Sequence, residues 1–435
     1  MRTICKPFLC LLLSMPVLAS AQDTTQRVNL HFQTTYIYQY KPAFHARYSG
    51  PFSLDKAEEK DNSLTATLYL GIRLWKGAEL YINPELAGGS GLSGACGMGG
   101  SSNGESFRVG DRAPTLYLAR AYAAQTFALG QATELQDDDA NQLAGRSPKD
   151  QLRLIAGKLS LADIFDINNY SNSPRDQFLN WSLMNNGAWD FAANVRGYTY
   201  MLASTAHYRK MDYRLAFATL PTTANGPDLE TGINKSISIN AEIGRSCQLK
   251  GKALNLRLLA FYNNAPMGSY RRALSLSPLP TDLDQTRTTG RVKWGLGLNA
   301  DYTLSDNWGL FSRLGWNDGQ TETWCFTEID HTASLGVSAD GHQWHRDEDQ
   351  AGLALVANGL SAPHREYLER GGNGFVLGDG RLSYAAESIA EIYYSCKPGK
   401  MPLYLSGDYQ FCLNPGYNRD RGPAQVLSFR LHLML

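Results

Sequence analysis

The chain has 435 residues, with 41 lysines and arginines against 41 aspartates and glutamates, and its hydrophobic fraction is 43%. The balanced charge gives no electrostatic footprint for nucleic acid and argues against a polybasic membrane-surface protein. With 11% aromatic residues, the chain is also too apolar and aromatic to be disordered.

The start of the chain predicts a secretory signal peptide over residues 1–21. The basic residues Arg2 and Lys6 precede a short apolar run, and an A-x-A cleavage site ends at Ala21. The apolar run is too short for a transmembrane helix. Removal of this segment leaves the mature chain, residues 22–435, with 39 basic and 41 acidic residues and a formal charge of −2.

After the signal peptide, apolar and polar residues alternate with a period of two, which indicates β-strands with two different faces. Such segments are about 9–13 residues long, longer than most strands but suited to a tilted strand that crosses a bilayer. We count about sixteen of them: 28–40, 63–75, 78–86, 115–127, 151–159, 197–208, 212–220, 235–246, 253–263, 292–304, 307–317, 324–338, 350–359, 386–396, 402–412 and 425–435.

The last strand shows the pattern most clearly. Phe429, Leu431 and Leu433 alternate with Arg430 and His432. We therefore expect the three apolar side chains to face lipid and the two basic ones to face a lumen.

The connections between these strands largely alternate between long and short. Outer-membrane barrels have short periplasmic turns and longer outside loops, so this pattern predicts an all-β transmembrane antiparallel barrel with a periplasmic N-terminus. Residues 128–150 are the exception, because this long segment falls on the periplasmic side, where we expect a short helix or a frayed turn. A periplasmic sandwich or propeller is the alternative, but no repeat of 40–50 residues supports a propeller.

The densest mixture of amide, charged and aromatic residues is the segment 161–190, after the fifth predicted strand. A barrel of this width is too wide for side chains alone to fill, so a long loop folded inward is the natural way to narrow it. This composition suits sugar binding, because amide and carboxylate groups can form hydrogen bonds with sugar hydroxyls, and aromatic rings can pack against the C–H face of a sugar ring. An outside loop with its own small core is the alternative interpretation.

Four runs of the sequence resemble the carbohydrate-selective porins of the OprB type. The longest covers residues 159–200, LSLADIFDINNYSNSPRDQFLNWSLMNNGAWDFAANVRGYTY, and the others are residues 64–93, 344–361 and 408–432. The resemblance spans nearly the whole mature chain in order. It implies a sixteen-stranded barrel in the outer membrane of a Gram-negative bacterium that passes small carbohydrates by passive diffusion. The C-terminal Leu435 departs from the aromatic residue with which such barrels usually end.

The resemblance also implies a constriction built from arginines with acidic and aromatic partners. Outer-membrane lipid and the barrel-assembly machinery are further expected partners, and a monomer and a homotrimer both remain open. The matching positions are Asn168, Asn169, Tyr170, Arg175, Asp176, Asn180, Trp181, Asn185, Asn186, Trp189 and Arg196, and Arg120 is a further lumen candidate on the fourth predicted strand.

Signals for enzymatic chemistry are weak. The pair His342 and His345 lacks the glutamate of the H-E-x-x-H zinc motif, and the glycine-rich run 371–374 has no surrounding βαβ unit. We therefore expect no metal, no cofactor and no catalytic residue. Two alternatives remain open, which are a barrel-embedded hydrolase and an adhesive barrel whose outside loops bind a partner. The five cysteines of the mature chain cannot all pair within one chain.

The signal peptide yields the first prediction. Because the A-x-A site ends at Ala21, the mature protein should begin at Gln22. Mass spectrometry of protein purified from the outer-membrane fraction tests this prediction. An intact Met1 would contradict it.

Overall fold

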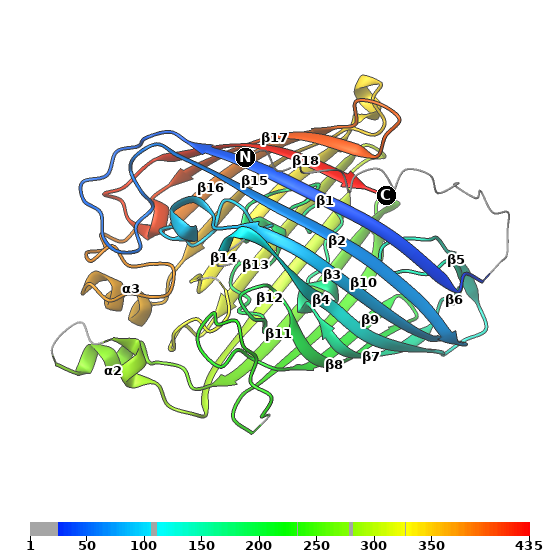
Figure 1. Cartoon of the computed structure of the whole chain (residues 1–435), viewed down its shortest axis with the longest axis horizontal. Helices are drawn as coiled ribbons and strands as arrows, with labels where there is room; N and C mark the ends of the chain where they lie inside the picture. The colour runs from blue at the N-terminus through cyan, green and yellow to red at the C-terminus, as the bar shows by residue number, and fades with distance from the viewer. Residues whose placement is uncertain (1–24, 106–110, 233, 278–281, 327) are drawn as a thin grey trace, which may run out of the picture.

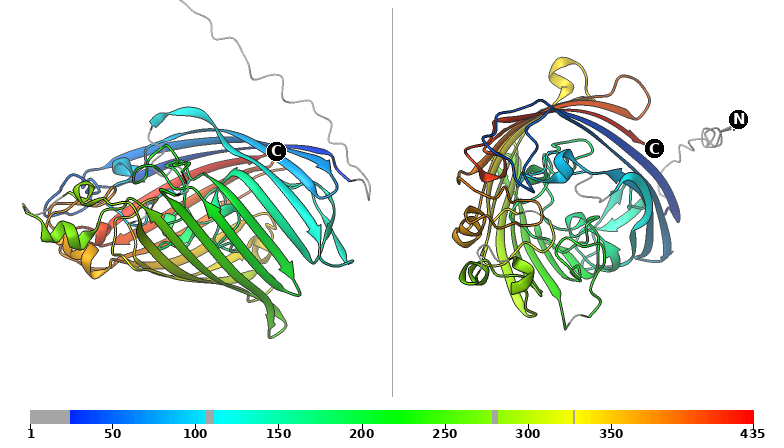
Figure 2. Two further views of the ribbon diagram at one scale, coloured as in Figure 1. Left: turned by 90° about the horizontal axis from the view of Figure 1, so that it is seen from below. Right: turned by 60° about the vertical axis from the view of Figure 1, so that its left-hand side comes forward.

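The computed structural model describes residues 25–105, 111–232, 234–277, 282–326 and 328–435, so the predicted signal peptide lies outside the described residues. Within this part of the chain, sixteen strands form one closed antiparallel barrel, and β1 (Val28–Lys41) closes it by pairing with β18 (Ala424–Met434). The strands run obliquely along the long axis of the molecule (Figure 1), and the ring is visible when one end comes forward (Figure 2). The predicted fold class is confirmed.

The remaining elements have the following bounds. The other barrel strands are β2 (Glu59–Trp75), β3 (Ala78–Gly89), β4 (Asp111–Ala128), β7 (Gln151–Leu159), β8 (Thr199–Tyr208), β9 (Met211–Ala218), β10 (Ile237–Leu249), β11 (Lys252–Ala265), β12 (Arg291–Thr303), β13 (Trp308–Asn317), β14 (His331–Asp340), β15 (Gln350–Gly359), β16 (Glu387–Cys396) and β17 (Leu403–Leu413). A separate two-stranded sheet contains β5 (Thr133–Gln136) and β6 (Gly145–Pro148). The helices are α1 (Trp181–Met184), α2 (Tyr270–Ser275) and α3 (Ala362–Glu369), and short 3₁₀ helices cover Leu92–Ala95, Leu161–Asp163, Leu283–Thr286, Gly341–Trp344 and Pro415–Tyr417. None of the helices in the described ranges is long and apolar enough to cross a bilayer.

The two faces of the strands carry different side chains, as the period of two predicts. On β18, Leu427 and Phe429 are 46% and 45% exposed on the outside, whereas Arg430 is fully buried inside and His432 is 5% exposed. The prediction that Arg430 and His432 face the lumen is confirmed. Apolar side chains on the outside and polar ones on the inside are the arrangement that a lipid-embedded barrel requires.

One predicted strand begins too early. Residues 324–338 read as a single strand, but β14 starts only at His331. Trp324 is fully buried in the preceding loop, and the backbone N–H groups of Trp324 and Cys325 both donate to the Asp190 carboxylate over 2.9 Å. The apolar residues in this stretch therefore belong to a core between loops, which the local pattern cannot distinguish from a strand.

The segment 128–150 forms the β5–β6 hairpin, so the expectation of a short helix or frayed turn was wrong. The hairpin lies at the barrel end opposite α2 and α3 (Figure 1). Asn29 of β1 donates to the Asp138 carboxylate over 2.9 Å, Asn83 of β3 donates to the Asn141 amide oxygen over 2.9 Å, and Leu143 is fully buried. These contacts hold the segment against the inner wall at this end of the barrel.

At the other end, the loops enclose a buried group of charges between α2 and α3. His364 of α3 contacts the Asp330 carboxylate over 2.9 Å, and its second ring nitrogen lies 3.7 Å from Glu328. Lys293 lies 3.9 Å from Asp330, and the ring of Tyr270 stacks on the His364 ring at a centroid distance of 4.3 Å. Because these charges are shielded from water, their pairing determines their protonation.

The pKa of His364 lies above its usual 6.5: burial lowers it, but Asp330 and Glu328 raise it by more. Burial alone would raise the pKa of Asp330, yet the charge and hydrogen bond of His364 hold it below its usual 3.8. The His364 contribution to stability is therefore complete below about pH 6.5 and is lost as the pH rises through the folded pKa. The Asp330 contribution is present above about pH 3.8 and is lost as the pH falls.

The pH dependence can be tested with His364→Asn. The variant should weaken the outer loops by on the order of 3 kcal/mol, since it removes the cation beside Glu328 and leaves Asp330 with Lys293 alone. The difference from wild type should be largest between about pH 3.8 and pH 6.5 and should shrink above that range. Limited proteolysis of the folded barrel across pH measures it, with the exposed His45→Asn as the control. Equal protection of wild type and His364→Asn at pH 5 would contradict the prediction.

A second test concerns the two faces of β18. Leu431→Arg places a charge on the lipid face, which costs up to about 2–4 kcal/mol near the membrane centre and should lower the yield of folded barrel. Arg430→Leu changes a lumen-facing residue, so the barrel should still form. Refolding into lipid vesicles, followed by gel mobility with and without heating, measures the yields. Similar yields for the two variants would be evidence against the assigned faces.

Candidate functional site

The residues between β7 and β8, 160–198, form a loop that lies inside the barrel, and we call it the inner loop. It begins with a 3₁₀ turn that Ser160 caps by accepting a hydrogen bond from the Ala162 backbone N–H. Its short helix α1 is capped in the same way by Asn180, which accepts from the Ser182 N–H. These local caps satisfy backbone donors at the two turns and fix the path of the loop.

One part of the inner loop is bound to β12. The amide of Asn168 donates to Asn299 over 2.7 Å, and the amide of Asn169 donates to Asp301 over 2.8 Å. Tyr170 continues the series with a 3.0 Å hydrogen bond between its hydroxyl and Thr303. Three consecutive loop residues therefore contact alternate residues on the inner face of one strand.

A second part of the inner loop is bound to the strands near the closure of the barrel. The Asn180 backbone N–H donates to Glu391 of β16 over 2.9 Å, and its side-chain amide donates to Gln410 of β17 over 3.0 Å. Arg430 of β18 donates to the carbonyl oxygens of Pro174 and Gln177 over 2.7 and 2.8 Å. The loop thus reaches strands that are distant from its own ends in sequence.

We call a side chain that attaches the inner loop to the barrel wall an anchor. Arg313 of β13 is an anchor with several hydrogen bonds to the loop. Its side chain is 1% exposed and forms an ion pair with Asp166 at 3.0 Å. It also donates to the carbonyl oxygens of Leu183 and Ser171 over 2.8 and 2.6 Å. One guanidinium therefore joins three separate points of the inner loop to the wall.

Two further predicted residues are anchors. The side-chain amide of Asn186 donates to the Leu314 carbonyl oxygen of β13 over 2.9 Å, and the indole N–H of Trp189 donates to Asn240 of β10 over 2.9 Å. Both side chains are therefore used in attachment to the wall.

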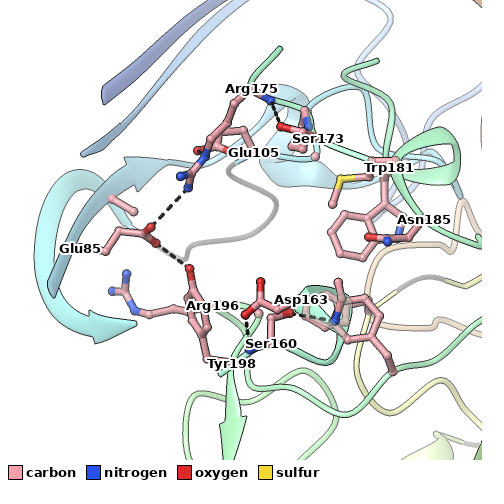
Figure 3. Close-up of a pocket in the computed structure, with 18 of the residues that line it drawn as sticks. Glu85, Glu105, Ser160, Asp163, Ser173, Arg175, Trp181, Asn185, Arg196 and Tyr198 are labelled. Atoms are coloured by element: carbon pink, nitrogen blue, oxygen red, sulfur yellow. Dashed lines mark hydrogen bonds and ion pairs between the residues drawn. The ribbon is translucent and has the colours of Figure 1, made fainter. Parts of the chain in front are cut away.

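A cavity of about 310 Å³ remains between the inner loop and the wall formed by β1, β3 and β4 (Figure 3). It contains five of the predicted residues: Arg120, Arg175, Trp181, Asn185 and Arg196. The lining is Gln33, Glu85, Ala87, Gly104, Glu105, Tyr117, Arg120, Ser160, Ala162, Asp163, Asn172, Ser173, Pro174, Arg175, Trp181, Met184, Asn185, Phe191, Val195, Arg196, Gly197, Tyr198 and Phe326.

Two of the three arginines in the cavity are paired with carboxylates. Arg175 forms ion pairs with Glu105 at 2.6 Å and with Glu85 at 3.3 Å. Arg120 forms a two-point contact with Asp163 over 2.7 and 2.6 Å. Charge-assisted contacts of this kind are short and directional, so they hold the planes of the guanidinium groups in place.

On the side of the cavity formed by β3 and β4, several hydroxyl groups form hydrogen bonds with the carboxylate of Glu85. This carboxylate accepts from the Thr67 hydroxyl over 2.6 Å and from the Tyr198 hydroxyl over 3.0 Å, and it also contacts the Tyr117 hydroxyl. Figure 3 shows Glu85 between Arg175 and Tyr198. Burial raises the pKa of the neighbouring Glu105 above its usual range, although Arg175 opposes the shift.

The opposite side of the cavity is aromatic. Trp181 packs against Phe326 and Phe191 with ring centroids 4.9 and 5.9 Å apart, and those two phenylalanines stack on each other at 4.5 Å. Trp181 and Asn185 lie across the cavity from Glu85 (Figure 3). The cavity therefore has a rigid aromatic side facing a side rich in hydrogen-bonding groups.

The remaining predicted residues lie outside the cavity lining. Six of them are anchors, namely Asn168, Asn169, Tyr170, Asn180, Asn186 and Trp189. Asp176 is exposed and is absent from the lining. Among the described residues, no group of three or more His, Cys, Asp or Glu side chains is positioned to hold a metal ion.

Sequence reasoning missed several functional candidates. Glu85 and Tyr117 are on lumen faces of strands, so the alternation could have identified them. Asp163 is in the inner loop, where the local composition gave no reason to separate it from the other polar residues. Glu105 comes from the loop after β3 and meets Arg175 only through the tertiary fold.

Comparison with known proteins gives a consistent assignment of fold. The chain is similar to the high-pH structure of Pseudomonas putida OprB, with a TM-score of 0.70, 15% identity and coverage of 94% of each chain. It is also similar to the outer-membrane channel DcaP of Acinetobacter baumannii, with a TM-score of 0.51, 11% identity and coverage of 94% of this chain and 97% of that one. No curated protein matches the sequence.

The family assignment comes from the sequence itself. The family model described as "Carbohydrate-selective porin, OprB family" matches residues 53–435, which is most of the chain. The protein therefore belongs to the OprB family of carbohydrate-selective porins, which are channels of the Gram-negative outer membrane.

Proposed function

We propose that the cavity beside the inner loop is the selective constriction through which small carbohydrates diffuse. The observation that carries this proposal is the attachment of the inner loop to β10, β12, β13, β16, β17 and β18, which leaves the cavity on the side of β3 and β4. Solute passing the loop on this side meets the cavity. Since the loop is held at many points, it can define a fixed pore size.

The chemistry of the cavity suits a sugar. The carboxylate of Asp163 is fixed by Arg120, and its remaining lone pair can accept from a hydroxyl group. Glu85 instead positions Arg175 and the two tyrosine hydroxyls that line the cavity.

Trp181, Phe191 and Phe326 together form the apolar side of the cavity, against which the C–H groups of a sugar ring can pack. Binding should be weak, because a channel must release the solute that it admits.

The alternatives are less well supported. A barrel hydrolase would need an activated nucleophile, and membership of a porin family favours a channel. Assays with a lipid substrate would identify hydrolysis, and a plugged barrel that binds a surface would support the adhesive function. Beyond the channel itself, we propose that residues 1–21 direct secretion, that the barrel-assembly machinery inserts the chain, and that outer-membrane lipid surrounds the barrel. Cross-linking in membranes can distinguish a monomer from a homotrimer.

Removing the inner loop should open the channel. Deletion of residues 168–190 takes away most of the anchors together with Arg175, Trp181 and Asn185, so ion conductance should rise and discrimination between sugars of different size should disappear. Conductance in planar bilayers and liposome swelling with a panel of sugars measure these effects. Unchanged conductance and selectivity would place the constriction elsewhere.

Single substitutions separate the cavity lining from the rest of the loop. Arg175→Ala and Trp181→Ala should each weaken the block of ion current by sugars, by about tenfold for the loss of one charge-assisted contact or one stacking surface, while the folded barrel persists. Asp176→Asn is the matched control, because Asp176 is on the same loop but is exposed outside the cavity. An equal effect of all three variants would indicate a general disturbance of the loop.

A further inference from the structure

Arg196 differs from the other two arginines of the cavity. Arg120 is paired with Asp163, and Arg175 is paired with Glu85 and Glu105. Within the described parts of the chain, Arg196 has no carboxylate partner at ion-pair distance, and its buried Nη1 atom has no hydrogen-bond partner. A cationic donor of this kind in a cavity is costly to leave unsatisfied.

The guanidinium of Arg196 is nevertheless held in a defined place. It lies over the ring of Tyr117 at 4.3 Å from the centroid, and the Tyr117 ring is itself packed against Tyr198 at 6.1 Å. Tyr117 also contacts Glu85 through its hydroxyl, so the aromatic platform is fixed from both sides. Arg196 therefore presents a positioned cation with unused hydrogen-bonding capacity at the edge of the cavity (Figure 3).

In the part of the chain that the structure describes, the guanidinium of Arg196 lacks an anionic hydrogen-bond acceptor, and a carboxylate on a ligand could fill this role. A guanidinium offers a planar fork of N–H donors that matches the two oxygens of a carboxylate, whereas a single sugar hydroxyl uses only part of it. The nearby carboxylates Glu85 and Glu105 do not oppose such a ligand strongly. Arg175 forms ion pairs with both of them, at 3.3 Å and 2.6 Å.

The size of the cavity limits the ligand. At about 310 Å³, it is at the lower end of the range of roughly 300–1,000 Å³ that is typical of small-molecule sites. This volume suits a single sugar ring better than a long oligosaccharide. Trp181 and Asn185 line the cavity on the side across from Glu85, where the body of the ring would lie.

We propose that Arg196 forms a carboxylate subsite in this cavity, so that the channel prefers sugar acids, such as hexuronates, to neutral sugars of the same size. This inference rests on the proposed function, because it needs solutes to pass through the cavity. Arg196 is then a specificity-determining residue. The subsite selects a carboxylate on the sugar, while the paired residues and the aromatic side accept the rest of the ring.

The test compares glucuronate with glucose, two solutes that share a ring and differ by the carboxylate. In planar bilayers containing the full-length mature protein, glucuronate should block the ion current about tenfold more tightly than glucose, as one charge-assisted contact would give. Arg196→Gln should abolish that preference, so that glucuronate and glucose block the current with similar affinity. Arg196→Lys, which keeps the charge but loses the planar fork, should show an intermediate preference.

The control is Arg209→Gln. Arg209 also lies over a tyrosine ring, at 5.0 Å from the Tyr208 centroid, but it is exposed on the short turn between β8 and β9. The Arg209→Gln variant should therefore keep the wild-type preference for glucuronate over glucose. Yields of folded barrel should be equal for all variants.

The outcomes separate the two proposals. If glucose and glucuronate block the wild type equally, or if the preference survives in Arg196→Gln, the carboxylate subsite is overturned while the sugar channel stands. If neither sugar blocks an open, ion-conducting barrel, both proposals are overturned.

Discussion

The attachment of the inner loop to the wall depends on buried charges that only the loop can satisfy. Arg313 is 1% exposed, and its partners Asp166, Ser171 and Leu183 are all loop residues. Removing one partner of a buried pair typically costs about 3–5 kcal/mol, because the remaining charge is left uncompensated. The polar inner face of the barrel therefore holds the loop in one place, and the position of the cavity follows from that placement.

The alternation of residues predicted most of the fold, because a closed barrel in lipid requires one apolar and one polar face on every strand. The pattern failed where tertiary contacts replaced it. Trp324 and Cys325 read as strand residues, yet their backbone N–H groups bind Asp190, a residue of the inner loop. A sequence window cannot show that an apolar residue packs between loops instead of on a strand.

The candidate site was predictable as a segment but not as a set of residues. The inner loop stands out by composition, but its polar side chains have two different roles. Asn169 and Asn180 attach the loop to β12 and β17, whereas Asn185 lines the cavity. The three are chemically identical, and only the path of the loop decides which of them meets a strand. For the same reason Glu105, from another loop, could not be linked to Arg175 in advance.

In the proposed constriction, the pairing of charges explains how a polar cavity can bind a sugar only weakly and release it. Arg120 and Arg175 are compensated by fixed carboxylates, so a neutral sugar meets oriented donors and acceptors without a strong net field. Such a site can exchange its hydrogen bonds with water at little cost, which keeps binding weak. Arg196 is the exception in this balance, since it has no carboxylate at ion-pair distance in the described parts of the chain and its buried Nη1 atom has no hydrogen-bond partner. In the function that we propose, selectivity for charge and permeability for neutral rings therefore depend on different residues of one cavity.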